Sequence, residues 1–257
     1  MAALHKPSNH VADAEQAARV DLAACHRLAV HFGLHEGIDN HFTALLPGSP
    51  NEFLLAPFGL HWSEVKASDF MVVNFDGQLV RGKGPIEDTA IHIHRPIHQL
   101  APHARCVLHT HMPYATALCM LEDPRLQMTG QGALMFHEDV AYYTDYNGLA
   151  LDDAEGARMA AALGAKSVLM LSNHGVVVVG RSFAQSFERL YFLERVAQVQ
   201  VLALSTGKPL RQIPPAIIAA TIAQYGGAVE VEGMSRADLH FTALKRVLDR
   251  SDRTYAA

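Results

Sequence analysis

Three features are scarce in this 257-residue sequence: cysteines, long apolar runs and clusters of positive charge. Cys25, Cys106 and Cys119 are odd in number and lie in apolar stretches, which favours buried thiols in a reducing compartment over a disulfide framework. No run of 18 apolar residues occurs, and the opening residues MAALHKPSNH lack the apolar region of a secretory leader. We therefore expect a cytoplasmic protein that has no membrane partner.

The charge balance also excludes one class of partner. The chain carries 21 basic and 26 acidic residues, for a net charge of −5, and no Lys/Arg cluster stands out, so we expect no nucleic-acid partner. Hydrophobic residues make up 49% and charged residues 18%, which is enough apolar material for a packed core. The length is at the upper end of what one core holds, and we expect a single domain over residues 1–257.

Hydrophobic periodicity and turn residues indicate the order of the elements. Asp13 and Gln16 resemble a helix start, Asp76-Gly77 is a strong hairpin signal, and Asp152 with Glu155 predicts a capped helix that stops at Gly164. Residues 122–150 are expected to be irregular, and two weaker helices follow the prolines of 208–215. Grouped, largely antiparallel strands bordered by helices indicate one α+β or α/β/α domain. The predicted helices are 14–32, 87–100, 113–121, 152–163 and 183–204, and the predicted strands are 41–46, 53–56, 71–75, 78–80, 105–111, 168–172 and 176–179.

Histidine is abundant, with 16 copies, and its spacing points to a metal site. His109 and His111 stand at positions i and i+2 near the end of a predicted strand, so their side chains project from the same face and can share an ion. His174, in a turn followed by Gly175, is the best candidate for a third ligand. On spacing alone the signal is weak, because surface or satisfied core histidines show the same pattern.

A second histidine set competes with the first. His94 and His98 are at i and i+4 on a predicted helix face, with His92 nearby, and such a pair can also hold a metal. No acidic residue completes the H-E-x-x-H pattern. We interpret these residues as packing on the helix face, with His94 in a position to orient a ligand.

Several segments resemble the class II aldolase/adducin superfamily over roughly residues 15–205. They read EGIDNHFTALLPG, FLLAPFGLHWSEVKASD, HIHRPIHQLAPHARCVLHTHMPYATAL and LMLSNHGVVVVGRSFAQSFERLYFLE. The resemblance implies a three-layer α/β/α sandwich with a mainly antiparallel central sheet, and residues 208–257 would then be a C-terminal helical extension. The sequence also resembles a branch that includes the non-haem iron oxygenase-decarboxylases of aminocoumarin antibiotic synthesis.

The resemblance also assigns metal ligands and an assembly. It implies that His109, His111 and His174 hold one divalent ion, with zinc expected first and iron, manganese or cobalt as alternatives. Members of the superfamily that are enzymes act on small molecules and are commonly homotetramers, with the site between subunits. We expect a homo-oligomer, most simply a tetramer, and the rings of Tyr142, Tyr143 and Tyr146 would suit an interface.

Two further residues gain catalytic roles from the resemblance. Glu87 matches the glutamate that serves these aldolases as acid/base, although it stands a few residues further from His109 than in the sugar-phosphate aldolases. Asp88 is a competing candidate, and Glu87 as a simple helix cap is the alternative. Tyr143 lies near the position of a family tyrosine that acts as an acid, with a buried structural role as the alternative.

The substrate-binding positions depart from those of the sugar-phosphate aldolases. Residues that hold phosphate there are replaced here by Asn40-His41-Phe42-Thr43, Pro57-Phe58-Gly59 and Pro85-Ile86. A phosphate dianion needs several donors, so these changes favour a non-phosphorylated, aromatic or partly apolar hydroxycarbonyl compound. The candidate substrate-binding residues are His41, Phe58 and Gly59.

Three functional hypotheses follow. The first is a metal-dependent carbon–carbon lyase of retro-aldol type, in which the metal acts as a Lewis acid and Glu87 moves a proton. The same site chemistry also serves epimerases, dehydratases and decarboxylases. The second is an Fe(II)-dependent oxygenase or decarboxylase that acts on an aromatic hydroxy acid. The third is a non-enzymatic adducin-like interaction module. We rank it last, because domains of that type lack the three ligand histidines that this sequence contains.

Overall fold

The computed structural model of the chain describes residues 9–226 and 230–257, so the predicted absence of a leader concerns residues that lie mostly outside it. The described residues contain one eight-stranded sheet with the strand order β4-β3-β2-β1-β5-β8-β7-β6. The strands are β1 (His41–Leu45), β2 (Glu52–Leu55), β3 (Met71–Asn74), β4 (Leu79–Arg81), β5 (Cys106–Thr110), β6 (Val140–Tyr143), β7 (Val168–Leu171) and β8 (Gly175–Gly180).

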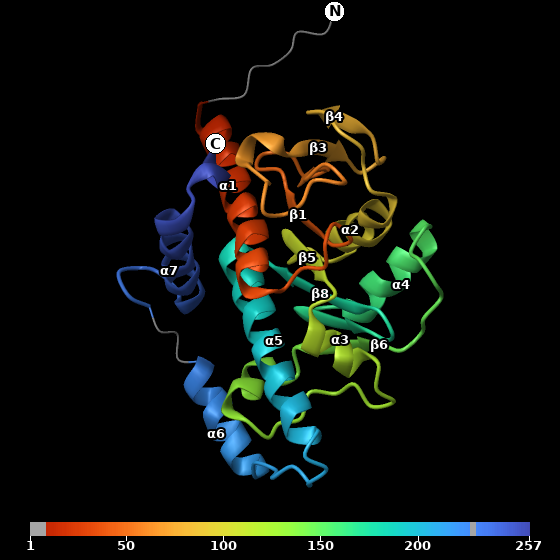
Figure 1. Ribbon diagram of the computed structural model, residues 1–257, viewed down its shortest axis with the longest axis vertical. Helices are drawn as coiled ribbons and strands as arrows, with labels where there is room; N and C mark the ends of the chain where they lie inside the picture. Colours follow the sequence, from red (N-terminus) through yellow and green to blue (C-terminus); the bar gives the residue numbers. More distant parts are fainter. Residues whose placement is uncertain (1–8, 227–229) are drawn as a thin grey trace, which may run out of the picture.

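Seven α-helices and three short 3₁₀ helices accompany the sheet in the described residues (Figure 1). The α-helices are α1 (Asn9–Phe32), α2 (Asp88–Leu100), α3 (Pro113–Cys119), α4 (Asp153–Leu163), α5 (Phe183–Leu204), α6 (Pro215–Gly226) and α7 (Arg236–Ser251). The 3₁₀ helices are η1 (Ala67–Asp69), η2 (Gln131–Phe136) and η3 (Thr254–Ala256).

The sheet is almost entirely antiparallel, as predicted. Both predicted hairpins are confirmed, because β1 pairs antiparallel with β2 and β3 pairs antiparallel with β4. The central strand β5 lies between β1 and β8, and its His109 stands opposite His41 on β1 and Val177 on β8. Only the edge pair β6–β7 is parallel among the described strands. This register brings residues from distant parts of the sequence together at His109.

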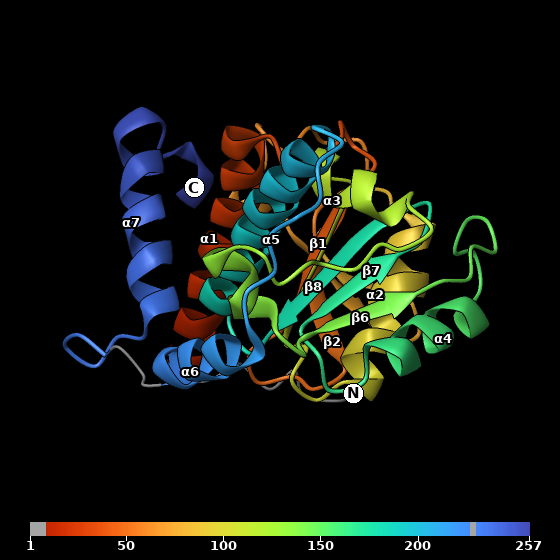
Figure 2. The same cartoon turned by 90° about the horizontal axis from the view of Figure 1, so that it is seen from below.

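Helices cover both faces of the sheet and form three layers, which confirms the α/β/α sandwich (Figure 2). One face packs through Phe42, Leu108 and Val178 into a core that also holds side chains of α1, α3, α5 and α7. The opposite face packs through Val107 and Val177 against α2 and α4. Alternation along β5 and β8 therefore supplies two cores, one on each side of the sheet.

Two predictions about local structure are wrong. Residues 122–150 are not wholly irregular, because η2 and β6 lie within them, and β6 pairs in parallel with β7 at the sheet edge. The first helix already includes Asn9, so Asp13 does not begin it. The strand β6 has only four residues and depends on a partner strand distant in sequence, so it carries little local signal of its own.

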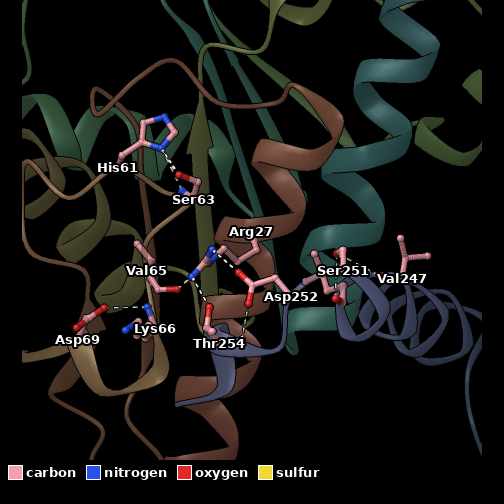
Figure 3. A network of polar contacts seen from close by, with 11 residues as sticks. Arg27, His61, Ser63, Val65, Lys66, Asp69, Val247, Ser251, Asp252 and Thr254 are labelled. Atoms are coloured by element: carbon pink, nitrogen blue, oxygen red, sulfur yellow. Dashed lines mark hydrogen bonds and ion pairs between the residues drawn. The ribbon is translucent and has the colours of Figure 1, made fainter.

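The C-terminal helix α7 is attached to the core and to α1. Phe241, Leu244 and Leu248 on one face of α7 are buried in the same core as α1 and α5. After α7, the guanidinium of Arg27 donates to Asp252 Oδ2 at 3.2 Å and to the Thr254 hydroxyl at 3.3 Å (Figure 3). None of the helices in the described parts of the chain is long and apolar enough to cross a membrane.

Candidate metal centre

Three histidines converge where β5 ends beside the turn between β7 and β8. His109 is the buried penultimate residue of β5, His111 follows the strand, and His174 stands just before β8. One potential ligand nitrogen from each of the three lies within 4.8 Å of the other two. Asn173 precedes His174 with φ = 57°, a left-handed conformation that asparagine tolerates better than most residues. The predicted histidine set is therefore brought together in space.

Hydrogen bonds at the opposite ring nitrogens fix the tautomers of two of these histidines. His109 Nδ1 donates to the Val176 carbonyl at 2.9 Å, and His111 Nδ1 donates to Glu36 Oε2 at 2.6 Å. In the neutral rings each Nε2 then carries a lone pair, and these two atoms face each other at 3.2 Å. Two nitrogens each about 2.0–2.1 Å from a tetrahedral zinc ion would lie about 3.3 Å apart. The histidine pair therefore fits a shared ion.

The electrostatics of the cluster favour the neutral form that binds metals. Burial, together with the neighbouring His174 and His41, holds the pKa of His109 well below its usual value. Burial and the nearby His111 lower the pKa of His174 to about 4. Because neutral imidazole is the ligating form, these two residues need not lose a proton at neutral pH before an ion binds.

Gly175 explains the His-Gly sequence at the third ligand. A Cβ atom at this position would lie 2.6 Å from the Thr110 carbonyl oxygen and 2.8 Å from Cδ2 of His111. Such separations are too short for a real side chain, so β8 can approach β5 this closely only with glycine. The glycine thus keeps the His174 turn against the strand that supplies the other two histidines.

A cavity of about 270 Å³ opens beside the histidine cluster. Its wall combines acidic side chains and imidazoles with apolar and aromatic residues. The lining residues are Asp39, His41, Phe58, Glu87, Thr89, Ile93, His109, His111, Tyr146, Gly148, Leu149, Ala150 and His174. Phe58 is 41% exposed, so its ring remains accessible at this surface. Of the predicted substrate-binding residues, His41 and Phe58 thus reach the cavity.

Glu87 caps a helix, as one of its two predicted roles requires, and it also lines this cavity, while its role as acid/base stays a prediction. It is the N-cap of α2, and its Oε2 accepts from the Ala90 amide at 3.1 Å. The Thr89 hydroxyl donates to the other carboxylate oxygen. Oε2 also lies 3.3 Å from His41 Nε2. Asp88, the competing candidate, is exposed at the first position of α2 and is not among the lining residues.

Three other residues predicted to shape the site lie elsewhere. Ile86 packs beside Phe53 and Leu55 in a separate apolar cluster, so it does not contribute the expected apolar wall. Gly59 borders a smaller neighbouring cavity. Tyr143 is only 8% exposed, and its hydroxyl accepts hydrogen bonds from Asn147 and Arg158. Within one chain the structure does not bring these three residues to the histidines.

The sequence did not indicate Glu36 or Thr89 as site residues, and it indicated Tyr146 only for an interface. Glu36 comes from the loop after α1 and reaches His111, which follows it by 75 positions in the sequence. Tyr146 is 54% exposed and lines the cavity where Tyr143 was expected. The segment EGIDNH, already distinctive in the sequence, contains Glu36, but nothing in its spacing shows which histidine it contacts.

Comparisons with known proteins agree with this fold. Residues 20–201 match the family model described as Class II Aldolase and Adducin N-terminal domain. The chain belongs to this family. A protein of Pseudomonas aeruginosa named as a candidate class 2 aldolase is 35% identical over 246 residues, which cover 95% of this chain and 94% of that protein. Alpha-adducin of Mus musculus is 36% identical over 200 residues, which cover 76% of this chain but only 27% of the adducin.

Solved class II aldolase structures share the fold over nearly the whole chain. An aldolase II superfamily protein from Pseudomonas syringae superposes with a TM-score of 0.86 at 34% identity, over 95% of this chain and 96% of that chain. An L-fuculose 1-phosphate aldolase from Glaciozyma antarctica PI12 superposes with a TM-score of 0.81 at 25% identity, over 96% of both chains. The predicted membership of the superfamily is confirmed, while the narrower branch of iron oxygenase-decarboxylases stays a prediction.

Proposed function

We propose that this protein is a divalent-metal-dependent carbon–carbon lyase of retro-aldol type that acts on a small, non-phosphorylated hydroxycarbonyl compound. The observation that carries the proposal is the convergence of three imidazoles beside a cavity that also contains the Glu87 carboxylate. Three protein ligands leave a coordination position free for a substrate or water, which is the arrangement of a catalytic site. Membership of the class II aldolase family supports the same assignment.

His109, His111 and His174 would hold the ion, and zinc is the metal that this donor set and the family favour most, with iron, manganese or cobalt as alternatives. When bound, a divalent ion supplies Lewis-acid polarisation to substrate oxygens. Val176 and Glu36 keep the His109 and His111 rings in the ligating orientation through their Nδ1 hydrogen bonds. These contacts mean that the chain would not have to reorganise the two rings for binding.

Glu87 would exchange the proton at the carbon where the carbon–carbon bond breaks or forms. Its carboxylate lines the cavity without belonging to the three-histidine cluster, so it remains available to a substrate. The Ala90 amide and the Thr89 hydroxyl hold it in place. A positioned carboxylate of this kind is a suitable general acid and base.

The cavity wall supports a substrate without phosphate. Among the described lining residues of one chain, none is lysine, arginine or serine, and Asp39 and Glu87 are acidic. A phosphate dianion would therefore meet negative charge and few donors. Phe58, Ile93 and Leu149 provide apolar surface instead, which suits an aromatic or partly apolar group on the substrate.

An oligomer, proposed here as a homotetramer, would place another chain near the cavity mouth. Leu149 in its wall and the nearby Leu151 are 73% and 58% exposed, so exposed apolar surface adjoins the cavity. Of the three tyrosines predicted to suit a subunit interface, only Tyr146 is exposed, because Tyr142 and Tyr143 pack within the chain.

Metal analysis of purified variants tests the proposal. The His109→Ala/His111→Ala double variant should lose most of its bound metal without unfolding, and His31→Ala, which changes an exposed residue of α1, should retain it. A screen of hydroxycarbonyl compounds, run with and without oxygen, then identifies the reaction. Full metal occupancy in the double variant would contradict the metal site, and strictly oxygen-dependent turnover would replace the lyase by an oxygenase.

A further inference from the structure

A chain of buried polar side chains runs from the edge of the cavity into the core between β1 and α2. His41 and Thr43 are two residues apart on β1, and His94 and His98 are four residues apart on α2, so each pair projects from one face of its element. The two faces meet. All four side chains are buried, with exposed fractions from 0% to 5%.

Close contacts connect these residues in a single line. His41 Nδ1 lies 2.7 Å from His94 Nε2, and His94 Nδ1 lies 2.6 Å from the Thr43 hydroxyl oxygen. The same oxygen lies 2.8 Å from His98 Nε2. His98 Nδ1 ends the line at the carbonyl oxygen of Ala104, at 2.7 Å.

The carbonyl at the inner end fixes the direction of every bond. Because Ala104 O can only accept, His98 Nδ1 must carry a proton, and the neutral ring then has a bare Nε2. Thr43 must donate its one hydroxyl proton to that nitrogen, so it can only accept from His94 Nδ1. His94 Nε2 is then bare as well, and it accepts from His41 Nδ1. With neutral rings, each hydrogen bond in the line therefore has only one possible donor.

The neutral state of the inner histidines has a physical basis. Burial lowers the pKa of His98 to about 4, against the opposing effect of its bond to Ala104. Burial also holds the pKa of His94 well below its usual value, and the neighbouring His41 and His98 add to this effect. An additional proton on either ring would place two N–H groups against one acceptor or against each other.

We propose that His98, Thr43 and His94 are positioning residues that fix His41 in its Nδ1–H tautomer, so that Nε2 of neutral His41 faces Glu87 and Thr89 as a hydrogen-bond acceptor. Both the Glu87 carboxylate and the Thr89 hydroxyl oxygen lie 3.3 Å from this nitrogen. Since Thr89 already donates to the other oxygen of Glu87, His41 is left as the acceptor for a proton carried on Glu87 Oε2.

This inference deepens the proposed function, and its catalytic meaning rests on Glu87 acting as acid and base. With an acceptor at 3.3 Å, the acid form of Glu87 has a defined direction for its proton and a defined rotamer. The bond directions themselves require neither a metal nor turnover. If the metal proposal fails, the inferred bond directions can still be correct. If the bond directions are wrong, the metal proposal can still be correct.

Neutron diffraction from crystals of the deuterated protein tests the directions without any substitution. We expect deuterium on Nδ1 of His98, His94 and His41, and none on Nε2 of His98 or His94. Deuterium on Nε2 of either inner histidine would overturn the inference. This measurement tests the bond directions even if the Thr43 variants do not fold.

Substitutions at Thr43 provide a second test, read by nitrogen NMR of protein labelled at histidine. Thr43→Val keeps the shape but removes the hydroxyl, so His94 should change from one tautomer to a mixture of both. Thr43→Ser should restore the single tautomer. Thr116→Val is the matched control, because the Thr116 hydroxyl oxygen is buried and has no hydrogen-bond partner among the described residues, and it should leave the histidine spectrum unchanged. A single Nδ1–H tautomer of His94 in Thr43→Val would contradict the proposal.

Discussion

Glu36 and Val176 determine which nitrogens of the histidine pair can bind an ion. Each accepts a hydrogen bond from the Nδ1–H of one ring, which leaves Nε2 of that ring bare and facing the other ring. The Val176 acceptor is a backbone carbonyl and cannot be removed by substitution, whereas Glu36 can. Glu36 therefore offers a direct test of how much the orientation of a ligand contributes to binding.

We predict that Glu36→Ala weakens zinc binding while leaving the three histidines in place. Loss of the partner of a ligating histidine commonly costs about 10–100-fold in metal affinity. Competition with a chromophoric chelator measures the change in Kd. Glu64→Ala, which changes an exposed glutamate elsewhere on the surface, is the control and should bind as the unchanged protein does. Equal affinity in Glu36→Ala would mean that the 2.6 Å contact to His111 does not orient the ligand.

We also predict that Glu87→Gln separates proton transfer from helix capping. Glutamine can still accept from the Ala90 amide, so stability and metal content should be retained, but turnover should fall by about 10²–10⁴, the usual effect of losing a positioned acid or base. Glu87→Ala should additionally destabilise the fold by about 0.5–2 kcal/mol through loss of the cap. The measurements are turnover of a substrate found in the screen and unfolding in urea. Asp88→Asn is the control, and a collapse of activity in that variant alone would transfer the role to Asp88.

At the scale of elements, the turns and helix caps that depend on residues adjacent in sequence could be predicted from the sequence. Asp76-Gly77 correctly marked a hairpin, and Asp152 does cap α4, accepting from the Glu155 amide at 2.8 Å. The strand β6 was missed because its four residues gain their structure from pairing with β7, about 28 positions away, and not from a pattern of their own. Pairing partners of this kind are invisible to periodicity.

In the candidate site, too, residues close in sequence could be predicted, whereas contacts between distant segments could not. Strand spacing indicated His109 and His111 and the turn before Gly175 indicated His174, but this signal is weak without the resemblance to the family. The contacts of Glu36 with His111 and of Thr43 with His98 could not be predicted, because they join a loop to a strand end and a strand to a helix. Ile86 was misplaced for a related reason, since an apolar residue beside Glu87 can turn either toward the cavity or toward the core.

Close packing of α4 on α2 depends on one glycine, and we predict that Gly156→Ala destabilises the protein. An added Cβ would lie 1.8 Å from the His92 carbonyl oxygen and 2.7 Å from Pro96 Cγ, so the helices must separate. Overpacking of this kind costs at least about 1–3 kcal/mol. Urea unfolding measures the loss. Gly130→Ala is the matched control, because nothing lies within 4 Å of its added Cβ. Equal stability of the two variants would show that α2 and α4 can shift freely.

At the scale of the whole molecule, we predict a homotetramer in solution. The exposed Leu149, Leu151 and Tyr146 lie together beside the cavity and would be covered by a neighbouring chain. Light scattering at micromolar concentration measures the mass. Replacing Leu149 by lysine should shift the protein toward smaller species, whereas Leu100→Lys, at an exposed position at the end of α2, should not. A fully active monomer would refute the prediction.

Acid sensitivity of the whole fold follows from histidines that are buried in their neutral form. Burial lowers the pKa of His26 and of His98 to about 4, while in the unfolded chain each returns to its usual value near 6.5. Between these two pH values the unfolded chain binds protons that the folded protein does not. These residues therefore contribute stability that is complete above about pH 6.5 and is lost as the pH falls through about 4.

We predict that the free energy of unfolding falls by about 1.4 kcal/mol per pH unit for each such histidine across this window. Glu188 and Glu194 act in the opposite direction at pH values above 4.5, because burial raises their pKa values. Urea unfolding at intervals from pH 7 to pH 4.5, with a chelator present, measures the slope without a contribution from released metal. His26→Gln, which removes one buried ring that is not among the three candidate metal ligands, should reduce the slope by about 1.4 kcal/mol per pH unit. A free energy of unfolding that stays constant across the window would mean that the fold admits protonated histidines more readily than their burial indicates.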